Sequence, residues 1–412
     1  MLPPFDEFIN SIPNAVWITG GLWLLLIVYF ALESMVHRFA LERIPVRVHV
    51  NGTRGKTSVA RLIAAGLRAG GLRVYAKTSG TLAAVTDENG NEYPVFRFAQ
   101  PNIIEQLRVM RRISVYRPDA CVIECMALQP RFQSLTEIHM VRATHGVITN
   151  ARRDHLDVMG PTGYDVALAL AGSTPVRARL FTGEREYIDV FAAAAEDRRT
   201  SLHQVSVADV EAVTDEMLAP FKYREHAENV ALALNLCVEL GVPRETALAG
   251  MAQLEPEPGA TQVCKLNYHS RELLFVNAFA ANDPESTRRI WEKVVARYPA
   301  EEGYRRIAVM NCRADRPHRS YEMAIAAAQW SRTDYFIVIG SGTIIFLREA
   351  LKRGIGSECI TVEEDADAAD VIETILEVCG KRALVVGMAN IKGAGGAVSR
   401  FFANRAETLE PL

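Results

Sequence analysis

The sequence predicts an α/β protein in which an N-terminal transmembrane helix precedes two domains, each built on a mostly parallel sheet. Three observations support this prediction. An uncharged apolar stretch opens the chain, short buried strands alternate with helices through most of the rest, and two prolines and a glycine interrupt the pattern near residue 258. Strands separated by crossover helices form parallel sheets with helices on both faces. We place the anchor at residues 1–44 and the domains at residues 45–257 and 258–412.

The first element is an apolar stretch between residues 12 and 32 that carries no charged side chain. A helix of about 20 apolar residues crosses the hydrocarbon core of a bilayer. We therefore expect one span over residues 12–36, approximately. Trp17 and Tyr29 would lie near the two membrane interfaces, where aromatic rings are enriched.

The charges that flank this stretch predict its orientation. Acidic residues precede it, and basic residues follow it at His37, Arg38, Arg43 and Arg47. Positive charge stays on the cytoplasmic side, so we expect a single-pass protein of the cell membrane with both domains in the cytoplasm. A cleaved signal peptide fits poorly, because the basic residues lie on the wrong side of the stretch. A buried core helix is the other alternative.

The composition of the chain argues against several classes of function. Its 46 basic and 49 acidic residues give a net charge of −3, and no strong basic run indicates a nucleic-acid partner. The seven cysteines form no Cys-x-x-Cys pair and show no spacing typical of a metal site. Cysteines in apolar runs suit a reducing compartment, which agrees with the cytoplasmic location.

The next element is a buried strand that ends in a glycine-rich turn and opens into a helix. The turn reads Gly52-Thr53-Arg54-Gly55-Lys56-Thr57-Ser58. Glycines let backbone N–H groups approach a phosphate, and the helix N-terminus adds partial positive charge. The full phosphate-loop pattern has a glycine where Val50 stands, so this is a shortened variant that starts at Gly52. An ordinary strand-to-helix turn leaves the motif unexplained. We therefore predict nucleotide binding, with Lys56 on the β- and γ-phosphates and Thr57 on magnesium.

Further strands and helices follow in alternation. For the central domain we predict a helix at residues 101–115 and strands at residues 72–76, 93–98, 120–124 and 146–149. Beyond the prolines, a smaller Rossmann-like sheet is predicted from five strands at residues 273–277, 307–311, 335–339, 359–362 and 383–386. Ligands bind at the carboxyl ends of such strands. One polar loop there, the glycine-rich run 387–396, is either a flexible lid or a turn.

Two strand ends in the central domain carry groups that suit a divalent cation. Glu124 closes its strand at the edge where the phosphate loop lies, so its carboxylate could hold magnesium directly or through water. A capping or solvated glutamate is the alternative. After the next strand, Asp154, His155 and Asp157 cluster, and a neutral imidazole there can bind a second ion. A structural or exposed histidine is equally compatible with the sequence.

Polar residues at two other places are candidates for ligand binding. His226 and Asn229 start a helix predicted at residues 225–240 and share one of its faces, so they could contact a base or ribose. Ordinary polar residues at a helix N-terminus are the alternative. In the second domain, Arg313 and Arg316 follow a strand, and an arginine can bind a carboxylate through two hydrogen bonds. They are either substrate clamps or surface arginines.

These motifs, in this order, resemble the Mur-ligase superfamily of ATP-dependent amide-forming ligases. Four segments are similar to those of that superfamily, at residues 52–58, 149–157, 226–229 and 282–286. Within the superfamily, the chain most resembles the poly-γ-glutamate synthase family. That resemblance depends on the N-terminal span and on the segments 77–81, 124–127 and 277–287. It extends over essentially the whole chain.

The resemblance implies an ATP-dependent ligase that polymerises glutamate through γ-carboxyl linkages by way of an acyl phosphate. It implies catalytic roles for Lys56, Glu124 and His155, and magnesium ligation by Thr57, Glu124 and His155. The positions that would bind ATP are Asn51, Gly52, Thr53, Arg54, Gly55, Lys56, Thr57, Ser58, His226, Asn229 and Asp283. Ser79, Arg313 and Arg316 are weaker candidates for contacts with the substrate.

The resemblance also implies partners, and the sequence departs from the family pattern in one region that matters. The implied partners are glutamate and the growing polymer, and membrane subunits of the PgsC/CapC and PgsA/CapA types. A homo-oligomer is a further expectation. Many Mur ligases carry a carbamylated lysine shortly after the His-Leu-Asp motif, but residues 168–172 contain no lysine. A second metal ion would then need a different ligand. Two alternatives remain: a membrane-anchored NTP-binding module that regulates or assembles a complex, and a Mur-type ligase with another amino-acid acceptor.

Overall fold

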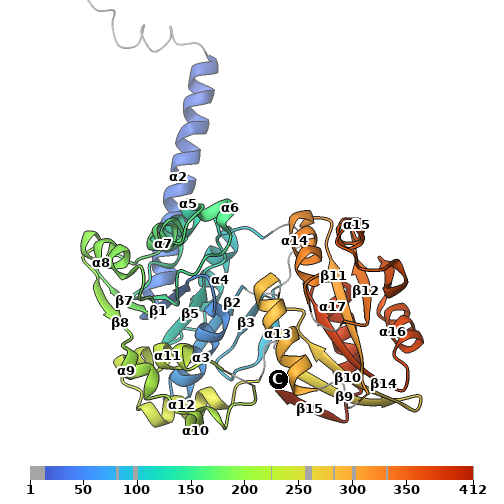
Figure 1. The fold of residues 1–412 in the computed structure, drawn as a ribbon. Coiled ribbons are helices and arrows are strands. Elements are labelled where there is room, and N and C mark those ends of the chain that lie inside the picture. The colour runs from blue at the N-terminus through green and yellow to red at the C-terminus, as the bar shows by residue number, and fades with distance from the viewer. Residues whose placement is uncertain are drawn as a thin grey trace, which may run out of the picture. The chain divides into compact units, whose positions relative to one another are not determined.

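The computed structural model describes residues 14–79, 83–95, 101–223, 225–255, 262–281, 284–298, 303–330 and 333–411. These residues form two compact units (Figure 1). The first contains the described residues up to Thr214 together with Ala227–Met251, and the second contains the described residues of Asp215–His226 and of Ala252–Leu412. Each unit is built on a largely parallel sheet, which confirms the predicted α/β class.

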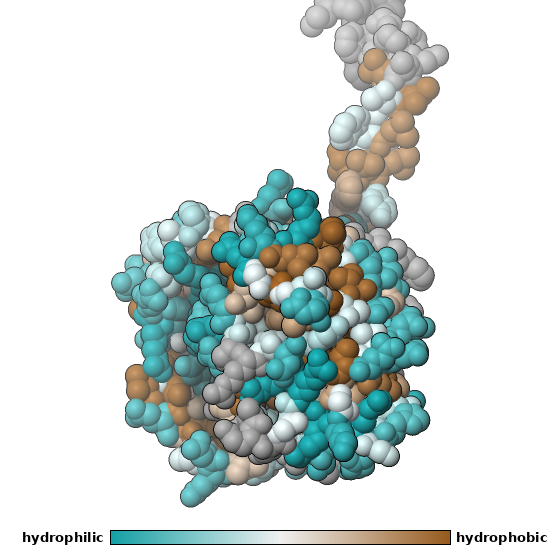
Figure 2. All heavy atoms as spheres, turned by 45° about the vertical axis from the view of Figure 1, so that its right-hand side comes forward, coloured by the Kyte–Doolittle hydropathy of each residue, from teal (hydrophilic) through white to brown (hydrophobic). Residues whose placement is uncertain are grey.

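Helix α2 (Asn14–Glu42) projects from the first unit with apolar side chains exposed along it (Figures 1 and 2). By length and composition, Val16–Glu42 could cross a membrane, and its most apolar window is entirely unburied. The helix continues past residue 36, where the sequence analysis ended it. His37 is buried there, and its Nε2 lies 2.8 Å from the carbonyl oxygen of Met140. The last turns of α2 therefore pack as part of the first unit.

The sheet of the first unit has eight strands in the order β4-β3-β2-β5-β1-β6-β7-β8. The strands from β2 to β8 in that order are parallel, and β3 and β4 extend the sheet as antiparallel strands. The bounds are β1 Val46–Asn51, β2 Val74–Thr78, β3 Ala84–Thr86, β4 Glu92–Pro94, β5 Ala120–Glu124, β6 His145–Ile148, β7 Arg179–Thr182 and β8 Ser201–Gln204. Strand β5 has the bounds predicted from the sequence, whereas β7 and β8 were not predicted.

Helices connect these strands, and α3 packs against both α11 and β2. Helix α11 begins at Ala227, later than the predicted start at Glu225. The bounds are α3 Lys56–Ala69, α4 Ile104–Ser114, α5 Pro130–Leu135, a π-helix at Thr136–Val141, α6 Leu156–Met159, α7 Gly163–Ala171, α8 Ile188–Asp197, α9 Val207–Glu211, α11 Ala227–Glu239 and α12 Arg244–Ala252. The short helix α10 (Asp215–Leu218) falls in the second unit.

The strand register brings three loops of the first unit to one edge. Val50 of β1 pairs with Glu124 of β5, and Asn51 of β1 pairs with Ile148 of β6. Parallel strands end at the same edge of their sheet. The turn after β1, the carboxylate of Glu124 and the segment after Ile148 therefore meet at the carboxyl edge of these three strands.

The sheet of the second unit has seven strands in the order β13-β12-β11-β14-β10-β9-β15. The five predicted strands are its parallel part, and β9 and β15 were missed. The strand bounds are β9 Gln262–Tyr268, β10 Arg271–Asn277, β11 Arg305–Cys312, β12 Tyr335–Gly340, β13 Ile360–Glu364, β14 Arg382–Met388 and β15 Thr408–Pro411. The helix bounds are α13 Pro284–Arg297, α14 Pro317–Ala327, α15 Ile344–Lys352, a 3-10 turn at Ser357–Cys359, α16 Ala368–Val378 and α17 Ala394–Ala403.

Strand β9 was missed because an unusual turn joins it to β10. The two strands pair antiparallel, and His269 and Ser270 make the turn with φ of 47° and 59°. A two-residue turn with positive φ at both positions is normally made by Asn-Gly or a similar pair. His-Ser carries no such signal, so the hairpin could not be found from local sequence.

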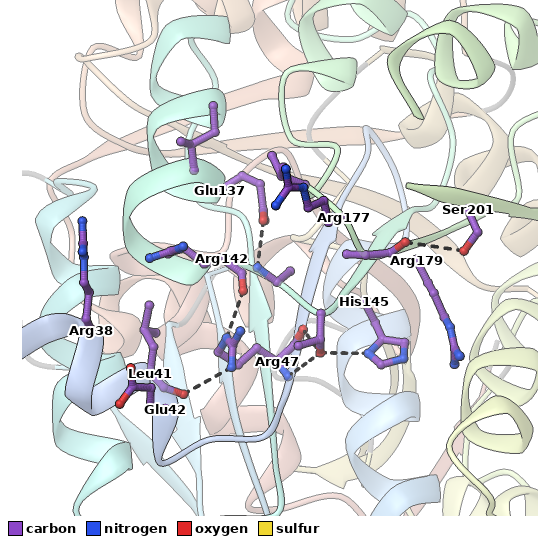
Figure 3. Close-up of a pocket in the computed structure, with 15 residues that line it drawn as sticks. Arg38, Leu41, Glu42, Arg47, Glu137, Arg142, His145, Arg177, Arg179 and Ser201 are labelled. Carbon is purple, nitrogen blue, oxygen red and sulfur yellow. Dashed lines mark hydrogen bonds between the residues drawn. The ribbon is translucent and has the colours of Figure 1, made fainter. Parts of the chain in front are cut away.

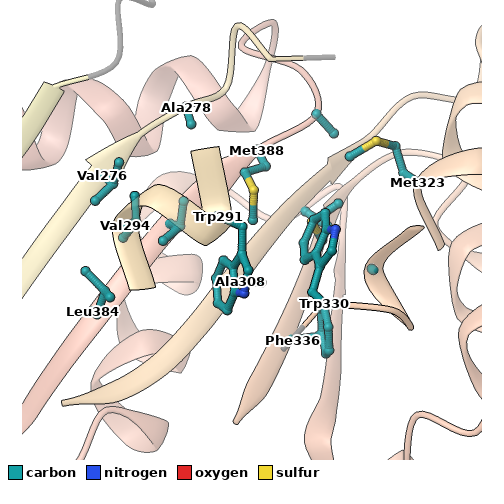
Figure 4. Close-up of a cluster of buried hydrophobic side chains, with 14 of the residues drawn as sticks. Val276, Ala278, Trp291, Val294, Ala308, Met323, Trp330, Phe336, Leu384 and Met388 are labelled. Carbon is teal, nitrogen blue, oxygen red and sulfur yellow. The ribbon is translucent and has the colours of Figure 1, made fainter. Parts of the chain in front are cut away.

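Apolar side chains cover both faces of the second sheet. On one face Trp291 of α13 stacks on Trp330, with ring centroids 5.6 Å apart, in a cluster that includes Ala308 and Leu384 (Figure 4). The other face belongs to a separate core cluster that includes Phe275 and Phe402. Burial on both faces is the pattern of a doubly wound sheet, which agrees with the Rossmann-like prediction.

Candidate active site

The turn between β1 and α3 is shaped by two glycines that no other residue could replace without strain. Gly52 has a φ of 133° and Gly55 a φ of 78°, a region that L side chains rarely adopt. A Cβ atom on Gly52 would lie 2.0 Å from Thr149 Oγ1, and one on Gly55 would lie 2.7 Å from Asn229 Oδ1. The backbone of the turn therefore approaches its neighbours more closely than any side chain permits.

Asn150 braces this turn from the end of the neighbouring strand. Its Oδ1 accepts hydrogen bonds from Thr53 Oγ1 at 2.7 Å and from the Arg54 N–H at 3.2 Å, and its Nδ2 donates to the Arg54 carbonyl at 3.1 Å. Thr149 Oγ1 donates to the same carbonyl at 2.6 Å. The sequence analysis assigned no role to these two residues. They hold the loop in shape.

Asn51, expected to touch the nucleotide, has its amide engaged within the protein. The residue is buried. Its Oδ1 accepts from the Gly52 N–H at 2.8 Å, and its Nδ2 donates to Gln133 Oε1 at 2.8 Å and to Ser173 Oγ at 2.9 Å. The side chain thus fixes the first glycine of the turn from beneath.

Lys56 opens α3 and folds back over the turn. Its Nζ donates to the Gly52 carbonyl at 2.7 Å and to the Thr53 carbonyl at 3.3 Å. Gly55 precedes the helix, and no side chain caps its N-terminus. Backbone N–H groups at an uncapped helix N-terminus attract anions. The ammonium group and the helix N-terminus therefore present positive charge at the same turn.

Thr57, Ser79 and Glu124, three predicted site residues, meet beside the turn. Glu124 is buried, and its Oε1 accepts a hydrogen bond from Thr57 Oγ1 at 3.1 Å. Its Oε2 accepts from the Ser79 N–H at 2.6 Å. A hydroxyl and a carboxylate are oxygen ligands of the kind that magnesium and manganese prefer, and magnesium usually keeps several waters as its other ligands. The donor set of the Thr57–Glu124 pair thus fits a hard divalent cation.

His155 lies in the segment between β6 and α6. It precedes α6 with a φ of 48°, and its Nε2 is 4.0 Å from Asp154 Oδ1. Asp154 Oδ2 in turn lies 3.5 Å from Arg54 Nε. Within the part of the chain that the structure describes, no three His, Cys, Asp or Glu side chains gather closely enough to hold a metal ion. A second metal site at His155 therefore stays a prediction.

A cavity of about 220 Å³ opens next to the turn. Its lining includes Asn150, Glu184, Tyr187 and Asn229. Glu184, which the sequence analysis did not single out, accepts a hydrogen bond from the Ala151 N–H at 2.6 Å. Because Asn229 borders both this cavity and Gly55, the cavity is placed to receive whatever extends from a phosphate on the turn.

His226 directly precedes α11 and belongs to the second unit. Its ring is exposed, and its backbone N–H donates to Glu225 Oε1 at 2.8 Å. It precedes the first residue of α11, so the face shared with Asn229 that the sequence analysis expected does not form within the helix. A role for His226 at the nucleotide stays a prediction.

Three of the predicted site residues, Asp283, Arg313 and Arg316, belong to the sequence of the second unit. Asp283 lies outside the described residues. Arg313 binds Asp315 through two hydrogen bonds of 2.9 and 2.6 Å, and this interaction lowers the pKa of Asp315 below its usual value. Arg316 is exposed and precedes α14. A substrate carboxylate would therefore have to replace Asp315 to bind Arg313, and the clamp stays a prediction.

The glycine-rich run 387–396 of the second unit forms a turn between β14 and α17 that side-chain hydrogen bonds stabilise. Asn311 Nδ2 donates to the carbonyl oxygens of Asn390 at 2.5 Å and Lys392 at 2.8 Å. Arg319 Nη1 donates to Asn390 Oδ1 at 3.0 Å. These contacts favour the second of the two predicted alternatives, a turn, over a flexible lid.

The geometry around Gly52 leads to a specific prediction. We expect Gly52→Ala to weaken nucleotide binding at least about tenfold, because the added methyl group would displace Thr149 and open the turn. Isothermal titration with ADP measures this effect. Gly71→Ala is the matched control, since Gly71 also has a positive φ, of 85°, but nothing lies within 4 Å of its Cβ position. Equal ADP affinity of Gly52→Ala and wild type would remove the turn from the nucleotide site.

Comparison with known proteins identifies the family. Residues 263–405 match the family described as the poly-gamma-glutamate synthase CapB C-terminal domain, and residues 50–169 match the Mur ligase middle domain. The chain is 36% identical over 387 residues to the capsule biosynthesis protein CapB of Bacillus anthracis, covering 92% of this chain and 81% of that protein. It is 35% identical over 382 residues to the PGA synthase CapB of Bacillus subtilis (strain 168), covering 90% and 95%.

Solved structures show the same fold at lower sequence identity. Escherichia coli FolC in complex with ADP has a TM-score of 0.65 at 17% identity, covering 90% of this chain and 93% of that chain. A bifunctional folylpolyglutamate synthase/dihydrofolate synthase with Mn, AMPPNP and L-glutamate bound has a TM-score of 0.61 at 15% identity, covering 90% and 93%. On the motifs, the fold and these relatives together, the chain belongs to the CapB family of poly-gamma-glutamate synthases and has a Mur-ligase-like fold.

Proposed function

We propose that the protein is an ATP-dependent ligase that polymerises glutamate through its γ-carboxyl group. The observation that supports this most directly is the meeting of Lys56 with the Thr57–Glu124 pair at one sheet edge, beside a turn whose two glycines lie directly against Thr149 and Asn229. The CapB relatives and the glutamate-bound synthase of the same fold agree with this reaction class.

The chemistry to be catalysed sets clear demands on the site. A carboxylate is a poor acyl donor, because oxide is a poor leaving group. Transfer of the γ-phosphoryl group of ATP to the glutamate γ-carboxylate makes an acyl phosphate, and attack by the amine of the next glutamate unit forms the amide and releases phosphate. The first step brings an anion toward a polyanion, so charge neutralisation and positioning dominate the catalysis.

The described residues meet these demands at the turn. We assign the β- and γ-phosphates of ATP to the Lys56 ammonium and the backbone N–H groups of residues 52–58, with Asn229 beside the cavity that would receive the nucleoside. Lys56 now donates to two loop carbonyls, and it would exchange these hydrogen bonds for phosphate oxygens. The Ser79 hydroxyl now donates to the Cys125 carbonyl at 3.3 Å, and it would exchange this hydrogen bond for one to the carboxylate substrate.

A divalent cation belongs to this proposal, and magnesium is the ion we assign. Thr57 and Glu124 would hold it, and it would offset the charge that develops on the phosphoryl group during transfer. The manganese in the related synthase structure supports a divalent ion in this fold. His155 and Asp154 are the candidates for a second ion, and Arg54 joins them to the turn.

We further propose that residues 1–44 anchor the enzyme in the cell membrane, with residues 45–257 as the ATP-binding domain and residues 258–412 as the second ligase domain. The exposed apolar surface of α2 supports the anchor, because burial in a bilayer is what such a surface requires. Basic residues follow the span, so the domains would face the cytoplasm. Membrane subunits of the PgsC/CapC and PgsA/CapA types would then receive the polymer.

A reconstituted assay tests the proposed reaction. Full-length protein in lipid nanodiscs is supplied with ATP, magnesium chloride and single amino acids, and ADP release is measured together with polymer length. We expect ADP release that depends on glutamate and a product whose linkages are γ-amides by NMR. ADP release without any amino acid would favour an NTP-binding regulatory module instead, and dependence on another amino acid would favour a different Mur-type ligase.

A further inference from the structure

A second, larger cavity lies at the opposite edge of the first sheet from the phosphate-binding turn. Its volume is about 1080 Å³. It is bordered by the amino ends of four strands, at Arg47 of β1, His145 of β6, Arg179 of β7 and Ser201 of β8 (Figure 3). The turn that contains Lys56 follows the carboxyl end of β1. The cavity is therefore separate from the candidate active site, and the ligase reaction assigns it no role.

Arginine is the dominant charged residue of this cavity, which we name the arginine pocket. Its five arginines are Arg38, Arg47, Arg142, Arg177 and Arg179. Arg38, Arg142 and Arg177 are exposed, and among the described residues none of the three forms a salt bridge. Three cationic side chains therefore face the opening with no carboxylate of the described chain paired to them.

Two other arginines have structural partners that hold the pocket in place. Arg47 Nη1 donates to the Ile44 carbonyl at 2.7 Å, and its Nε donates to the Arg142 carbonyl at 2.9 Å, so it ties the end of α2 to the segment before β6. Arg179 forms a salt bridge with Glu239. These contacts within the protein therefore preform this side of the pocket without a ligand.

Five arginines outnumber the acidic residues of the pocket, and one of the acidic residues is engaged inside the protein. Glu42 and Glu137 are the two that line it. Glu137 is buried and lies 2.7 Å from His49 Nδ1. Burial alone would lower the pKa of His49, but hydrogen bonds with Cys125 and Glu137 outweigh it and raise the pKa to about 10. The other carboxylate oxygen of Glu137, Oε1, accepts a hydrogen bond from the Ala143 N–H at 2.8 Å. Both oxygens of Glu137 are therefore engaged inside the protein.

The arginine pocket is continuous with the apolar helix. Arg38 and Leu41 belong to α2, whose uncharged segment ends at Leu32. A helix rises about 1.5 Å per residue, which puts Arg38 about 9 Å beyond that end. Headgroups occupy the layer directly outside the hydrocarbon core of about 30 Å. If α2 spans the membrane as proposed, the pocket opens at the depth of the lipid phosphates.

The pocket also carries apolar surface beside its arginines. Val176 is 53% exposed and Ile138 is 38% exposed, and both line the cavity. Water is a poor environment for such side chains, and an inorganic anion would leave them uncovered. A ligand with a phosphate group and an adjoining apolar part would cover both kinds of surface.

We propose that the arginine pocket binds the phosphodiester headgroup of an anionic phospholipid from the leaflet that holds the C-terminal end of α2. The planar guanidinium group of arginine binds two phosphate oxygens at once through paired hydrogen bonds. The cytoplasmic leaflet contains anionic lipids, which are attracted to basic groups near a membrane span. This inference rests on the proposed membrane insertion of α2. It adds to the ligase proposal a lipid that orients the enzyme on the membrane.

The test uses full-length protein in nanodiscs of phosphatidylcholine alone or with 30 mol% phosphatidylglycerol. Native mass spectrometry releases the protein from the nanodisc and gives the number of lipid molecules of each kind that stay bound to it. Wild type is expected to retain phosphatidylglycerol in preference to phosphatidylcholine. The double variant Arg142→Gln/Arg177→Gln is expected to lose this preference at least tenfold. Arg348→Gln/Arg400→Gln removes the same charge from exposed sites on α15 and α17 and should behave as wild type.

Competition distinguishes the sources of the anion. Inorganic phosphate at 10 mM and short poly-γ-glutamate are each added to the phosphatidylglycerol nanodiscs. Retention of phosphatidylglycerol in both cases supports the lipid, whereas full displacement by phosphate or by the polymer overturns it in favour of that ligand. Equal retention of the two lipids by wild type, or unchanged retention by Arg142→Gln/Arg177→Gln, also overturns the proposal.

Two further readouts separate this inference from the proposals on which it depends. Glutamate-dependent ADP release by Arg142→Gln/Arg177→Gln should equal that of wild type, because neither residue belongs to the active site, and it shows that the variant is folded. Alkaline carbonate extraction of membranes reports on α2. Release of wild type into the soluble fraction would overturn both the anchor and the lipid pocket, and retention in the membrane without lipid preference would overturn the pocket alone.

Discussion

Lys56→Ala is expected to abolish glutamate-dependent ADP release, with a decrease in kcat of about 100- to 1,000-fold, the usual loss when one charge-stabilising group is removed from a transition state. The side chain reaches over the turn to the carbonyls of Gly52 and Thr53, so its charge lies where the γ-phosphate would be transferred. Steady-state kinetics with saturating ATP and glutamate measure the effect. The fold should survive, because Lys56 is only partly buried and its side chain bonds to two carbonyls of the turn rather than to the apolar core.

The control for Lys56→Ala is Lys352→Ala. Lys352 lies on α15, its side chain is 74% exposed, and its Nζ lies 3.9 Å from Glu349, which also pairs with Arg353 at 2.8 Å. An exposed lysine at this distance contributes little to stability, and Glu349 keeps Arg353 as its partner, so both kcat and the thermal midpoint of Lys352→Ala should match those of wild type. A Lys56→Ala enzyme with more than about a tenth of wild-type kcat would remove Lys56 from phosphoryl transfer.

Glu124→Gln is expected to raise the magnesium concentration for half-maximal activity about 10- to 100-fold, in line with the loss that follows changes around metal ligands. The substitution removes the negative charge but keeps the shape of the side chain. The amide oxygen can still accept from the Ser79 N–H, and the amide nitrogen can donate to Thr57 Oγ1, so both hydrogen bonds have replacements. A magnesium titration of ADP release measures the effect.

Glu88→Gln is the matched substitution for this second experiment. Glu88 is an exposed carboxylate in the turn between β3 and β4, and its loss should leave the magnesium dependence unchanged. The protein unfolding midpoint of Glu124→Gln should stay within a few degrees of wild type, which shows that a changed metal requirement does not come from unfolding. An unaltered magnesium titration in Glu124→Gln would contradict the assignment of the ion to the Thr57–Glu124 pair.

The candidate site shows which features local sequence can reveal. The run Gly52-Thr53-Arg54-Gly55-Lys56-Thr57-Ser58 identifies a strand, a turn and a helix start within a few residues, and the structure has β1 and α3 on either side of it. The buried strand β5 could be placed with its true bounds because it is a continuous apolar run that ends in Glu124. Parallel strands share an edge, so the approach of Glu124 to the turn followed from these two assignments.

Other features depend on residues far apart in the chain, and local patterns do not encode them. Asn150 holds the carbonyl of Arg54 across 96 positions, and nothing in its own neighbourhood marks it as a brace. The hairpin of β9 and β10 turns at His269 and Ser270, a pair with no turn signal. The tertiary structure alone reveals these contacts.

By itself the sequence determined the α/β class, the apolar helix at the N-terminus and the glycine-rich turn between β1 and α3, because each depends on periodicity or spacing within one short segment. Only the tertiary structure decided that Asn51 and Asn150 support the turn and that arginines from α2, β1 and the segments before β6 and β7 surround one cavity. The physical reason is that hydrogen bonds and charge neighbours are set by how strands align in the sheet, and strand alignment brings together residues that the chain itself keeps apart.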